Sequence, residues 1–348
     1  MKYIPEYKVL GMMSGTSLDG LDLAICRFKK TTYWEFKIEE TNTINYPIYW
    51  KNKLEKLHLK NIEEIKYFDE LFGTYIGRCA NNFIKNQSID YISSHGHTIF
   101  HQPEKKFTLQ IGNGEEIKKI TKITTINNFR EIDVSLNGQG APLVPIGDLY
   151  LFPKYKYCLN LGGFANISIK NNNSIIAFDI CPVNIILNYV AKKINLEYDN
   201  NGEIARNGKI IPSLLKTLNN LSYYRKSSPK SLSREWLEKT IIPFIDNYSN
   251  IQNILNTLCE HIAWQIGHLL KNKKTLITGG GAFNKYLIER IKYYSKSNII
   301  IPSSNLIQFK EALIFSFLGV LRIRNEINCL KSVTGAKEDS CSGIIHSI

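Results

Sequence analysis

The sequence of 348 residues lacks any stretch that approaches the ~18 uncharged apolar residues of a membrane span. Its first residues, Met1–Glu6, lack the apolar core of a secretory signal, so we expect a cytoplasmic protein. With 43% hydrophobic and 11% aromatic residues, the chain does not belong to the disordered or the collagen-like class. Its length predicts two lobes of about 150–200 residues, each able to bury a core.

The sequence also has no C-x-x-C pair. Its cysteines are scattered along the chain, at positions 26, 79, 158, 181, 259, 329 and 341. An odd number of dispersed cysteines favours reduced, mostly buried thiols over a disulfide framework or a structural zinc site.

No basic segment matches a nucleic-acid-binding module, although the formal net charge is +13. The chain is rich in Lys, Asn, Ile and Tyr throughout, and its basic residues do not gather into one arm. We therefore expect no nucleic-acid partner and no membrane partner. A positive field of this kind is compatible with capture of an anionic substrate.

Two common nucleotide-binding motifs are missing as well. No G-x-x-x-x-G-K-[ST] sequence occurs, which excludes a Walker-type phosphate loop. The run Gly279–Gly281 fails the G-x-G-x-x-G spacing, because Asn284 stands where the third glycine would fall. A dinucleotide-binding fold is therefore not expected.

What the sequence does contain is one pattern that occurs twice: an apolar strand, a glycine turn and two further strands. The first copy has predicted strands at 8–13, 21–26 and 33–38, with the glycine turn at 14–20. The second copy has predicted strands at 157–161, 167–169 and 175–179, a turn at Gly162-Gly163, a hairpin tip at 171–174 and a helix over about 183–193. This repeat predicts a duplicated α/β fold with a cleft between two lobes, in which both glycine turns grip one polyphosphate through backbone N–H groups.

A third glycine-rich turn follows a predicted strand at 275–278 and precedes a predicted helix over about 285–293. This order is typical of a loop that contacts a nucleotide. Apolar residues at helical spacing predict core-facing helices over 62–85, 253–270 and 310–322. The stretch 195–235 is rich in Asn, Ser and Lys, which predicts surface loops with short helices.

Four segments carry specific strings: G-M-M-S-G-T-S-L-D-G at 11–20, S-H-G-H-T at 94–98, F-R-E-I-D at 129–133 with G-Q-G-A-P-L-V-P at 138–145, and N-L-G-G-F-A-N at 160–166. Further matches lie at 178–179, 279–284 and 310–312. Taken together, they resemble the anhydro-N-acetylmuramic acid kinase family, within the sugar kinase/Hsp70/actin superfamily. The resemblance covers nearly the whole chain in the family's order.

The resemblance implies an α/β, two-lobe, actin-like ATPase fold with a central interlobe cleft. We place residues 1–135 and about 318–348 in the N-terminal lobe and residues 136–317 in the C-terminal lobe. It also implies an enzyme that uses ATP, Mg²⁺ and water to open the 1,6-ether of 1,6-anhydro-N-acetylmuramic acid and phosphorylate the freed O6. The product, N-acetylmuramic acid 6-phosphate, belongs to peptidoglycan recycling. The family's members are often dimers, but nothing in this sequence fixes a self-association surface.

In such a reaction one carboxylate base is sufficient. If the departing O6 receives the γ-phosphoryl group, no general acid has to protonate it, and the base has only to activate the water. Asp179 is the candidate, because it ends an apolar strand before a helix and matches the aspartate of the family's D-T-G-P-G-N motif. The alternative is that Asp179 caps the following helix.

We assign ATP binding to the three glycine turns. The residues are Gly15, Thr16, Ser17, Leu18, Asp19 and Gly20 in the first turn, Asn160, Gly162 and Gly163 in the second, and Gly280, Gly281 and Asn284 in the third, on the adenosine side. Asp19 is also the candidate Mg²⁺ ligand. The alternative is that it only stabilises its hairpin by bonding its own backbone.

The candidate sugar-binding residues are His95, Arg130 and Glu311. Arg130 offers a bidentate fork for the lactyl carboxylate or for a phosphate, and its alternative is a salt bridge with Asp133 or Glu131. For Glu311, which opens an apolar helix, stabilisation of the helix dipole competes with binding of a sugar hydroxyl.

The histidine-rich segment has a second interpretation. His95, His97 and His101 have the spacing of a loop zinc site, but neither a cysteine nor the H-E-x-x-H spacing accompanies them.

The chain departs from the family's pattern at several positions. Cys181 and Val183 replace two glycines of D-T-G-P-G-N, so we expect backbone approach to a ligand to be obstructed there. Asn188 replaces an acidic residue, His97 a glutamine and Asn128 an aspartate. Two further functions are therefore considered: an ordinary hexosamine kinase, and a non-enzymatic nucleotide-binding protein of the same superfamily.

Overall fold

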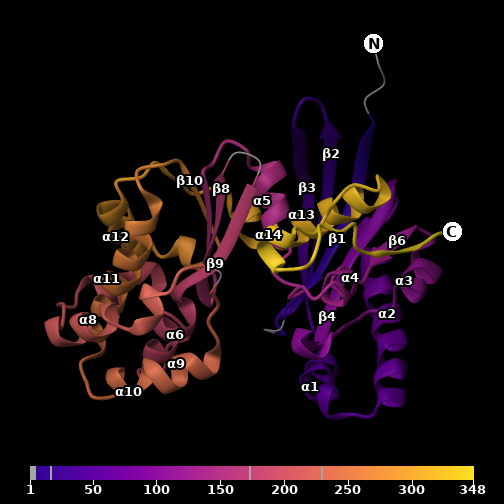
Figure 1. The fold of residues 1–348 in the computed structure, drawn as a ribbon. Helices are drawn as coiled ribbons and strands as arrows, with labels where there is room; N and C mark the ends of the chain where they lie inside the picture. Colours follow the sequence, from indigo (N-terminus) through magenta and orange to yellow (C-terminus); the bar gives the residue numbers. More distant parts are fainter. Residues whose placement is uncertain (1–4, 16–17, 172–173, 229) are drawn as a thin grey trace. The chain divides into compact units, whose positions relative to one another are not determined.

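The structure is a computed structural model that describes residues 5–15, 18–171, 174–228 and 230–348. The chain forms two compact units, which are described separately here: unit 1 is Met1–Leu151 with Phe309–Ile348, and unit 2 is Phe152–Gln308 (Figure 1).

Unit 1 therefore extends further along the chain than the boundaries placed from the sequence at 135 and 318. The physical reason is packing between the segments that those boundaries assign to the other lobe. Lys310 and Asp148 form a buried ion pair of 2.7 Å, and Gly147 packs directly against Ile314.

The sheet of unit 1 has the strand order β12-β6-β4-β1-β2-β3, with β5 paired to β4. Its strands are β1 (Glu6–Ser14), β2 (Gly20–Lys30), β3 (Trp34–Asn45), β4 (Tyr91–Gln102), β5 (Phe107–Ile111), β6 (Thr125–Asn127) and β12 (Ile344–His346). Strands β1, β2 and β3 are antiparallel neighbours, whereas β4 runs parallel to β1 and β6 parallel to β4. Strand β1 is buried from Val9 to its end, as its almost continuous apolar run requires.

The helices of unit 1 are α1 (Ile48–Lys56), α2 (Ile62–Ile84), α3 (Gly114–Thr121), α4 (Glu131–Ser135), α5 (Val144–Leu151), α14 (Lys331–Thr334) and the part of α13 (Ser304–Ile323) that begins at Phe309. Short 3₁₀ turns lie at Leu57–Leu59 and Pro103–Lys105. The predicted stripe of α2 is buried in the same core as the apolar side chains of β1 and β2. Helix α13 passes so close to β1 that a Cβ at Gly11 would lie 2.1 Å from the Ala312 carbonyl oxygen, so only glycine fits there.

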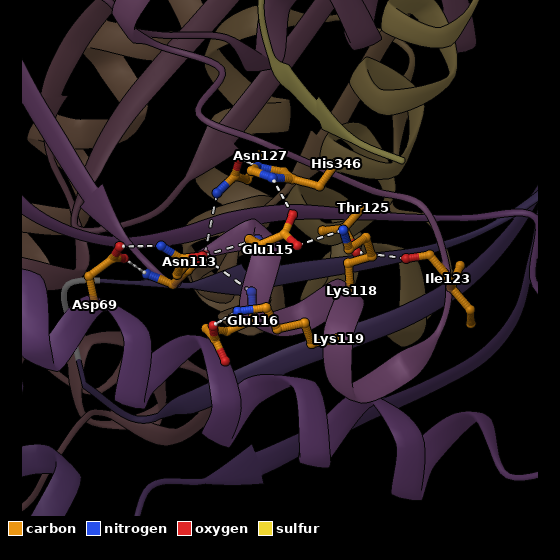
Figure 2. Close-up of polar contacts among 11 residues, drawn as sticks. Asp69, Asn113, Glu115, Glu116, Lys118, Lys119, Ile123, Thr125, Asn127 and His346 are labelled. Atoms are coloured by element: carbon orange, nitrogen blue, oxygen red, sulfur yellow. Dashed lines mark hydrogen bonds and ion pairs between the residues drawn. The ribbon is translucent and has the colours of Figure 1, made fainter. Parts of the chain in front are cut away.

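Helix α3 begins at a cluster of polar side chains (Figure 2). The Asn113 side-chain oxygen accepts the N–H groups of Glu115 (3.1 Å) and Glu116 (3.2 Å) and so caps the helix. The Asp69 carboxylate of α2 accepts the Gly112 N–H (2.7 Å) and the Asn113 Nδ2–H (3.0 Å). The Asn113 side chain therefore both caps α3 and attaches it to α2.

The C-terminal strand is bound to the same cluster. The His346 Nε2 of β12 lies 3.0 Å from the Asn127 Oδ1, and its Nδ1 lies 3.5 Å from the Glu115 carboxylate. Residues more than 200 positions apart in the sequence thus meet at one end of unit 1.

The sheet of unit 2 has the strand order β11-β10-β7-β8-β9. Its strands are β7 (Tyr157–Leu161), β8 (Phe164–Asn171), β9 (Ser174–Pro182), β10 (Thr275–Thr278) and β11 (Ile299–Ile300). Strands β7, β8 and β9 are antiparallel neighbours, and β10 runs parallel to β7. Unit 2 therefore repeats the order of β3-β2-β1-β4-β6 in unit 1, which confirms the duplicated α/β fold.

The helices of unit 2 are α6 (Asn184–Lys192), α7 (Glu203–Arg206), α8 (Pro212–Asn219), α9 (Arg234–Thr240), α10 (Ile242–Ile245), α11 (Ile251–Leu270) and α12 (Lys285–Ser295). Short 3₁₀ turns lie at Asn200–Gly202, Ser222–Arg225 and Gly280–Phe283. Helices α11 and α12 pack side by side (Figure 1). The short elements between 195 and 235 agree with the predicted loops and short helices, and the middle of the predicted tip at 171–174 lies outside the described residues.

The seven cysteines are free thiols, and all but Cys341 are buried, as predicted. In the described residues, no helix is both long and apolar enough to cross a membrane. The cytoplasmic location stays a prediction.

Candidate active site

Asp179 lies in a row of polar residues that crosses the sheet of unit 2. Thr278 of β10 pairs with Asn160 of β7, Asn160 with Asn166 of β8, and Asn166 with Asp179 of β9. Directly paired residues on neighbouring strands project from the same face of a sheet. The candidate base therefore shares a face with Asn160, a candidate residue of the second phosphate turn.

The surroundings of Asp179 keep its carboxylate accessible. It is partly buried, and its Oδ2 accepts the Leu232 N–H at 2.9 Å. Burial raises the pKa of Asp179, and the bond from Leu232 opposes that shift. Within the described chain, no cationic side chain forms an ion pair with this carboxylate. Asp179 also does not cap α6, whose N-cap is Val183, so the helix-capping alternative is wrong.

The backbone around Asp179 is fixed by a loop from elsewhere in unit 2. The Asp179 N–H donates to the Lys230 carbonyl (3.1 Å), and the Tyr223 hydroxyl donates to the Asp179 carbonyl (2.7 Å). The Lys230 ammonium lies over the Tyr223 ring, 4.8 Å from its centroid. These contacts hold the backbone of Asp179 without using its carboxylate.

The second phosphate turn joins β7 to β8. The carbonyls of Gly162 and Gly163 accept N–H groups from the start of α6, at 3.2 Å and 2.8 Å. Among the described residues, the N–H groups of these two glycines make no turn or loop backbone hydrogen bond, and Gly163 is exposed. They are therefore available to phosphate oxygens.

The third turn borders a cavity of about 840 Å³ within unit 2. Gly280, Gly281 and Asn284 all line it, together with Asn188 and Tyr198. The turn is connected to the second phosphate turn, because Gly279 (φ +83°) passes so near Asn160 that a Cβ would lie 2.6 Å from its Oδ1. Asn284 also caps α12 by accepting the Leu287 N–H (3.0 Å), which leaves its Nδ2 as a donor.

The first phosphate turn lies in unit 1 between β1 and β2. Thr16 and Ser17 lie outside the described residues. Of the rest, the Leu18 N–H donates to the Gly15 carbonyl (3.3 Å), and Leu18 has a positive φ of 60°. Gly20 ends the turn and pairs with Asn45 of β3.

Asp19 is exposed on this turn. Among the described residues, its carboxylate accepts no hydrogen bond from the hairpin backbone; Thr16 and Ser17 of the same turn lie outside them, so both interpretations of Asp19 stay open. A carboxylate oxygen suits Mg²⁺, which is commonly bound by one or two carboxylates together with substrate phosphates and water. The described residues contain no group of three side chains that could hold a metal ion. Mg²⁺ bound mainly by phosphates and water does not require such a group.

The structure brings His95 and Arg130 into direct contact. Arg130 donates through Nε (3.0 Å) and Nη2 (2.8 Å) to the His95 Nε2, and through Nη1 to the Gly140 carbonyl (2.6 Å). The His95 Nδ1–H donates to the Gly96 carbonyl (2.9 Å). The imidazole is neutral because its Nε2 accepts the Arg130 N–H groups and so carries no proton. Burial, together with the charge of Arg130, places the pKa of His95 well below its ordinary value.

The alternative for Arg130, a salt bridge with Asp133 or Glu131, is wrong. The Asp133 carboxylate accepts the Gly140 N–H (2.7 Å), and Glu131 accepts the side-chain amide of Asn128. Burial lowers the pKa of Arg130 to about 10, so it still carries its charge at neutral pH.

Glu311 lies near this pair, on the first turn of α13 after Phe309. Phe315, one turn further along, packs on the His95 ring at 4.5 Å and lies 6.0 Å below the Arg130 guanidinium. The charges of Glu311 and Arg130 influence each other's pKa, which places the three candidate sugar-binding residues in one region of unit 1. Glu311 is exposed to solvent, so it can bind a sugar hydroxyl. Its position near the start of a helical segment also allows it to stabilise the helix dipole, so both interpretations stay open.

The zinc interpretation of the histidines receives no support from their contacts. His95 bonds Arg130, His97 lies 2.9 Å from the Ser14 Oγ, and His101 lies 3.1 Å from the Thr108 Oγ1. The three imidazoles therefore have separate partners.

Comparison with known proteins identifies the family. The family model "Anhydro-N-acetylmuramic acid kinase" matches residues 7–347. Anhydro-N-acetylmuramic acid kinases of Sulfurovum sp. and Crocosphaera subtropica are 32% and 33% identical, over 97% of this chain and 99% and 98% of theirs. The chain belongs to the anhydro-N-acetylmuramic acid kinase family.

Membership in the anhydro-N-acetylmuramic acid kinase family makes the chain an enzyme, a phosphotransferase of that class. It does not favour an ordinary hexosamine kinase or a protein that binds nucleotides without catalysis. A glucokinase of the ROK family from Streptomyces griseus is similar in structure over 91% of this chain and 99% of its own, at 9% identity and a TM-score of 0.40. A similarity this weak says nothing further about function.

The departures from the family's motif do not have the effect we expected. Cys181 and Val183 are both fully buried in the hydrophobic core of unit 2. Neither residue has a positive φ, the conformation that favours glycine. Their side chains point into the core and do not block the face that carries Asp179.

The sequence interpretation missed two features. The first is Asn166, which is exposed and lies directly opposite Asp179. In the sequence analysis it appears only as part of a motif. The available signal was its position near the start of the strand that pairs with the strand of Asp179. The second feature is a buried contact of Ser14 with Tyr46 and His97. No local pattern indicated it, because Tyr46 and His97 are far from Ser14 in the sequence.

Proposed function

We propose that this chain uses ATP and water to open the 1,6-ether of 1,6-anhydro-N-acetylmuramic acid and to phosphorylate O6, a step of peptidoglycan recycling. The observation that carries this proposal is the state of Asp179. Its carboxylate is partly buried, accepts one backbone N–H and has no cationic partner in the described chain. A carboxylate in that state can take a proton from water.

In the proposed reaction, Asp179 removes a proton from a water molecule, and the water oxygen bonds to the anomeric carbon C1. The bond from C1 to O6 breaks, and O6 bonds to the γ-phosphorus as the bond to ADP breaks. Asn166 faces Asp179 across β8 and β9 and would hold the water from its other side. The N–H groups of Gly162 and Gly163 would stabilise the phosphate oxygens.

The substrates are proposed to bind as follows. The adenosine part of ATP occupies the cavity beside Gly280, Gly281 and Asn284, whose volume is in the range of ligand pockets. Arg130, oriented by His95, binds the lactyl carboxylate of the sugar, and Glu311 binds a hydroxyl. When bound, Mg²⁺ would be held by Asp19 and would neutralise phosphate charge.

The Asp179→Asn variant tests the proposed base. We expect loss of ADP release by at least about a hundredfold, the usual contribution of general base catalysis, with ATP affinity unchanged. The matched control is Asp246→Asn, which removes an exposed carboxylate that pairs with Lys193 and should leave turnover unchanged. Near-normal product formation by Asp179→Asn would contradict the assignment.

The use of water is tested by the wild-type enzyme in ¹⁸O-water. The proposed reaction places the label at C1 of the phosphorylated product, whereas a kinase acting on a free hydroxyl places none there through catalysis. A panel of anhydro and free amino sugars in the same ADP-release assay defines the acceptor.

A further inference from the structure

Three buried side chains form a chain of hydrogen bonds at the base of the first phosphate turn. The Tyr46 hydroxyl lies 2.7 Å from the Ser14 Oγ, and the Ser14 Oγ lies 2.9 Å from the His97 Nδ1. All three residues are less than 5% exposed. No step of the proposed reaction uses them.

The direction of these bonds is determined by the chemistry of the groups. The Tyr46 hydroxyl donates to Ser14, so the Ser14 hydroxyl is free to donate its own hydrogen. The acceptor is the His97 Nδ1, which requires the neutral imidazole with its proton on Nε2. Burial favours the same state, since it lowers the pKa of His97 to about 4. The order of donors is therefore Tyr46, Ser14, His97.

The network joins both ends of the turn to the sheet. Ser14 is the last residue of β1 and directly precedes Gly15. At the other end, Gly20 pairs with Asn45, the residue before Tyr46. His97 belongs to β4, where it pairs with Ser14. One serine hydroxyl thus connects the start of the turn to the strand that holds its end and to the neighbouring strand.

We propose that Tyr46, Ser14 and His97 are positioning residues that fix Gly15 and Gly20, the two described ends of the first phosphate turn, for ATP binding. This inference rests on the proposed function of that turn. Loss of one member leaves a buried polar group without its partner, which costs free energy unless the strands shift. A shift of these two ends by a fraction of an ångström changes their distance from the phosphates, and catalysis is sensitive to such displacements.

The test compares His97→Leu with His97→Gln, because the glutamine side chain retains an acceptor for Ser14. For His97→Leu we expect roughly a tenfold rise in KM for ATP and in Kd for ADP, the effect of about one lost buried hydrogen bond, together with a fall in kcat. His97→Gln should restore most of both. Ser14→Ala and Tyr46→Phe should act in the same direction, and Tyr46→Phe keeps the shape of the core.

The Kd for ADP of the double variant Ser14→Ala/His97→Leu should be no higher than that of the single variant with the higher Kd, because both changes break the same hydrogen bond. Ser93→Ala is the control for a purely structural effect. Ser93 is a fully buried serine of β4 that bonds the Phe315 carbonyl, so its loss should lower thermal stability without raising Kd for ADP.

Wild-type Kd for ADP in His97→Leu, failure of His97→Gln to restore binding, or an equal rise in Kd in Ser93→Ala would each overturn the proposal. ADP binding is measured without sugar and without turnover. If the wild-type enzyme binds ADP but does not phosphorylate the anhydro sugar, the proposed function fails while this inference is still tested by the same series.

Discussion

A carboxylate that activates water must be ionised at the pH of the reaction, and its surroundings decide where that pH lies. At Asp179 two effects oppose each other: burial raises the pKa, and the Leu232 N–H lowers it. The net direction is upward from 3.8. The ionised form is therefore a stronger base than an ordinary aspartate, and it is lost at a higher pH as the solution is acidified.

We predict that the acid side of the pH profile of kcat reports this group. Below the raised pKa, Asp179 carries a proton and cannot take another, so the rate should fall tenfold per pH unit with a midpoint above 3.8. In Leu232→Pro the N–H that bonds Oδ2 is absent, which should move the midpoint upward by about one unit. Asp246→Asn should not move it. A midpoint that Leu232→Pro leaves unchanged would contradict the assignment of this limb to Asp179.

The sugar-binding candidates depend on one another in a comparable way. Neutral His95 is the acceptor for two N–H groups of Arg130, and so it fixes the plane of the guanidinium. His95 itself has both ring nitrogens engaged, Nδ1 with Gly96 and Nε2 with Arg130. In the proposed binding of the sugar, His95 would therefore orient Arg130 and would not contact the sugar directly.

At the scale of elements, the ends of strands carry the polar residues of both units. Turns after β1, β7 and β10 hold the three glycine-rich segments, and Asp179 lies near the end of β9. Strands of this kind are covered by apolar packing on their faces, so their ends are where backbone N–H groups and carboxylates reach solvent. Helix α3 shows the same principle in a structural role, since one asparagine determines where it begins.

We predict that Asn113→Ala destabilises the protein by about 1 kcal/mol or more, because Asn113 caps α3 through two N–H groups and also bonds Asp69. Asn61→Ala is the matched comparison, because Asn61 caps α2 through the single N–H of Glu64. Urea denaturation should show a larger loss for Asn113→Ala. An equal or smaller loss would contradict the structural role given to the contact with Asp69.

At the scale of the whole molecule, the candidate groups are divided between the two units. His95, Arg130 and Glu311 belong to unit 1, whereas Asp179 and the cavity beside Gly280 belong to unit 2. The candidate residues that hold the sugar therefore lie in unit 1, whereas the candidate nucleotide contacts lie in unit 2 and in the first phosphate turn of unit 1. The cleft between lobes and the homodimer remain predictions.

Amide hydrogen exchange tests this division. ADP alone should slow exchange in unit 2, at 279–284 and the start of α12, and in unit 1 at the first phosphate turn. The anhydro sugar alone should slow exchange in unit 1, near 94–97 and 130. Bound ligand reduces local opening, so protection marks the segments that it contacts. Protection of the same segments by both ligands, or none in unit 2 with ADP, would contradict the proposed sites.

By itself, the sequence determined the duplicated α/β pattern and the family, and it supplied the candidate residues of the proposed site. These are local properties: apolar periodicity, glycine turns and strings such as M-S-G-T-S-L-D-G can be read without knowing what packs against them. The extension of β3 to Asn45 was not predicted. The full length of β4 was not predicted either, because apolar and polar residues do not alternate in S-H-G-H-T as they do in an ordinary strand.

Tertiary structure alone decided which side chains meet. The pairing of Asn166 with Asp179 depends on strand register, the contact of His95 with Arg130 joins residues 35 positions apart, and Ser14 bonds His97 across 83 positions. It also decided that Cys181 faces the core, since a shift of the strand pairing by one residue would have turned its side chain to the other face of the sheet. Such contacts arise from the packing of distant segments, for which a single sequence carries no local signal.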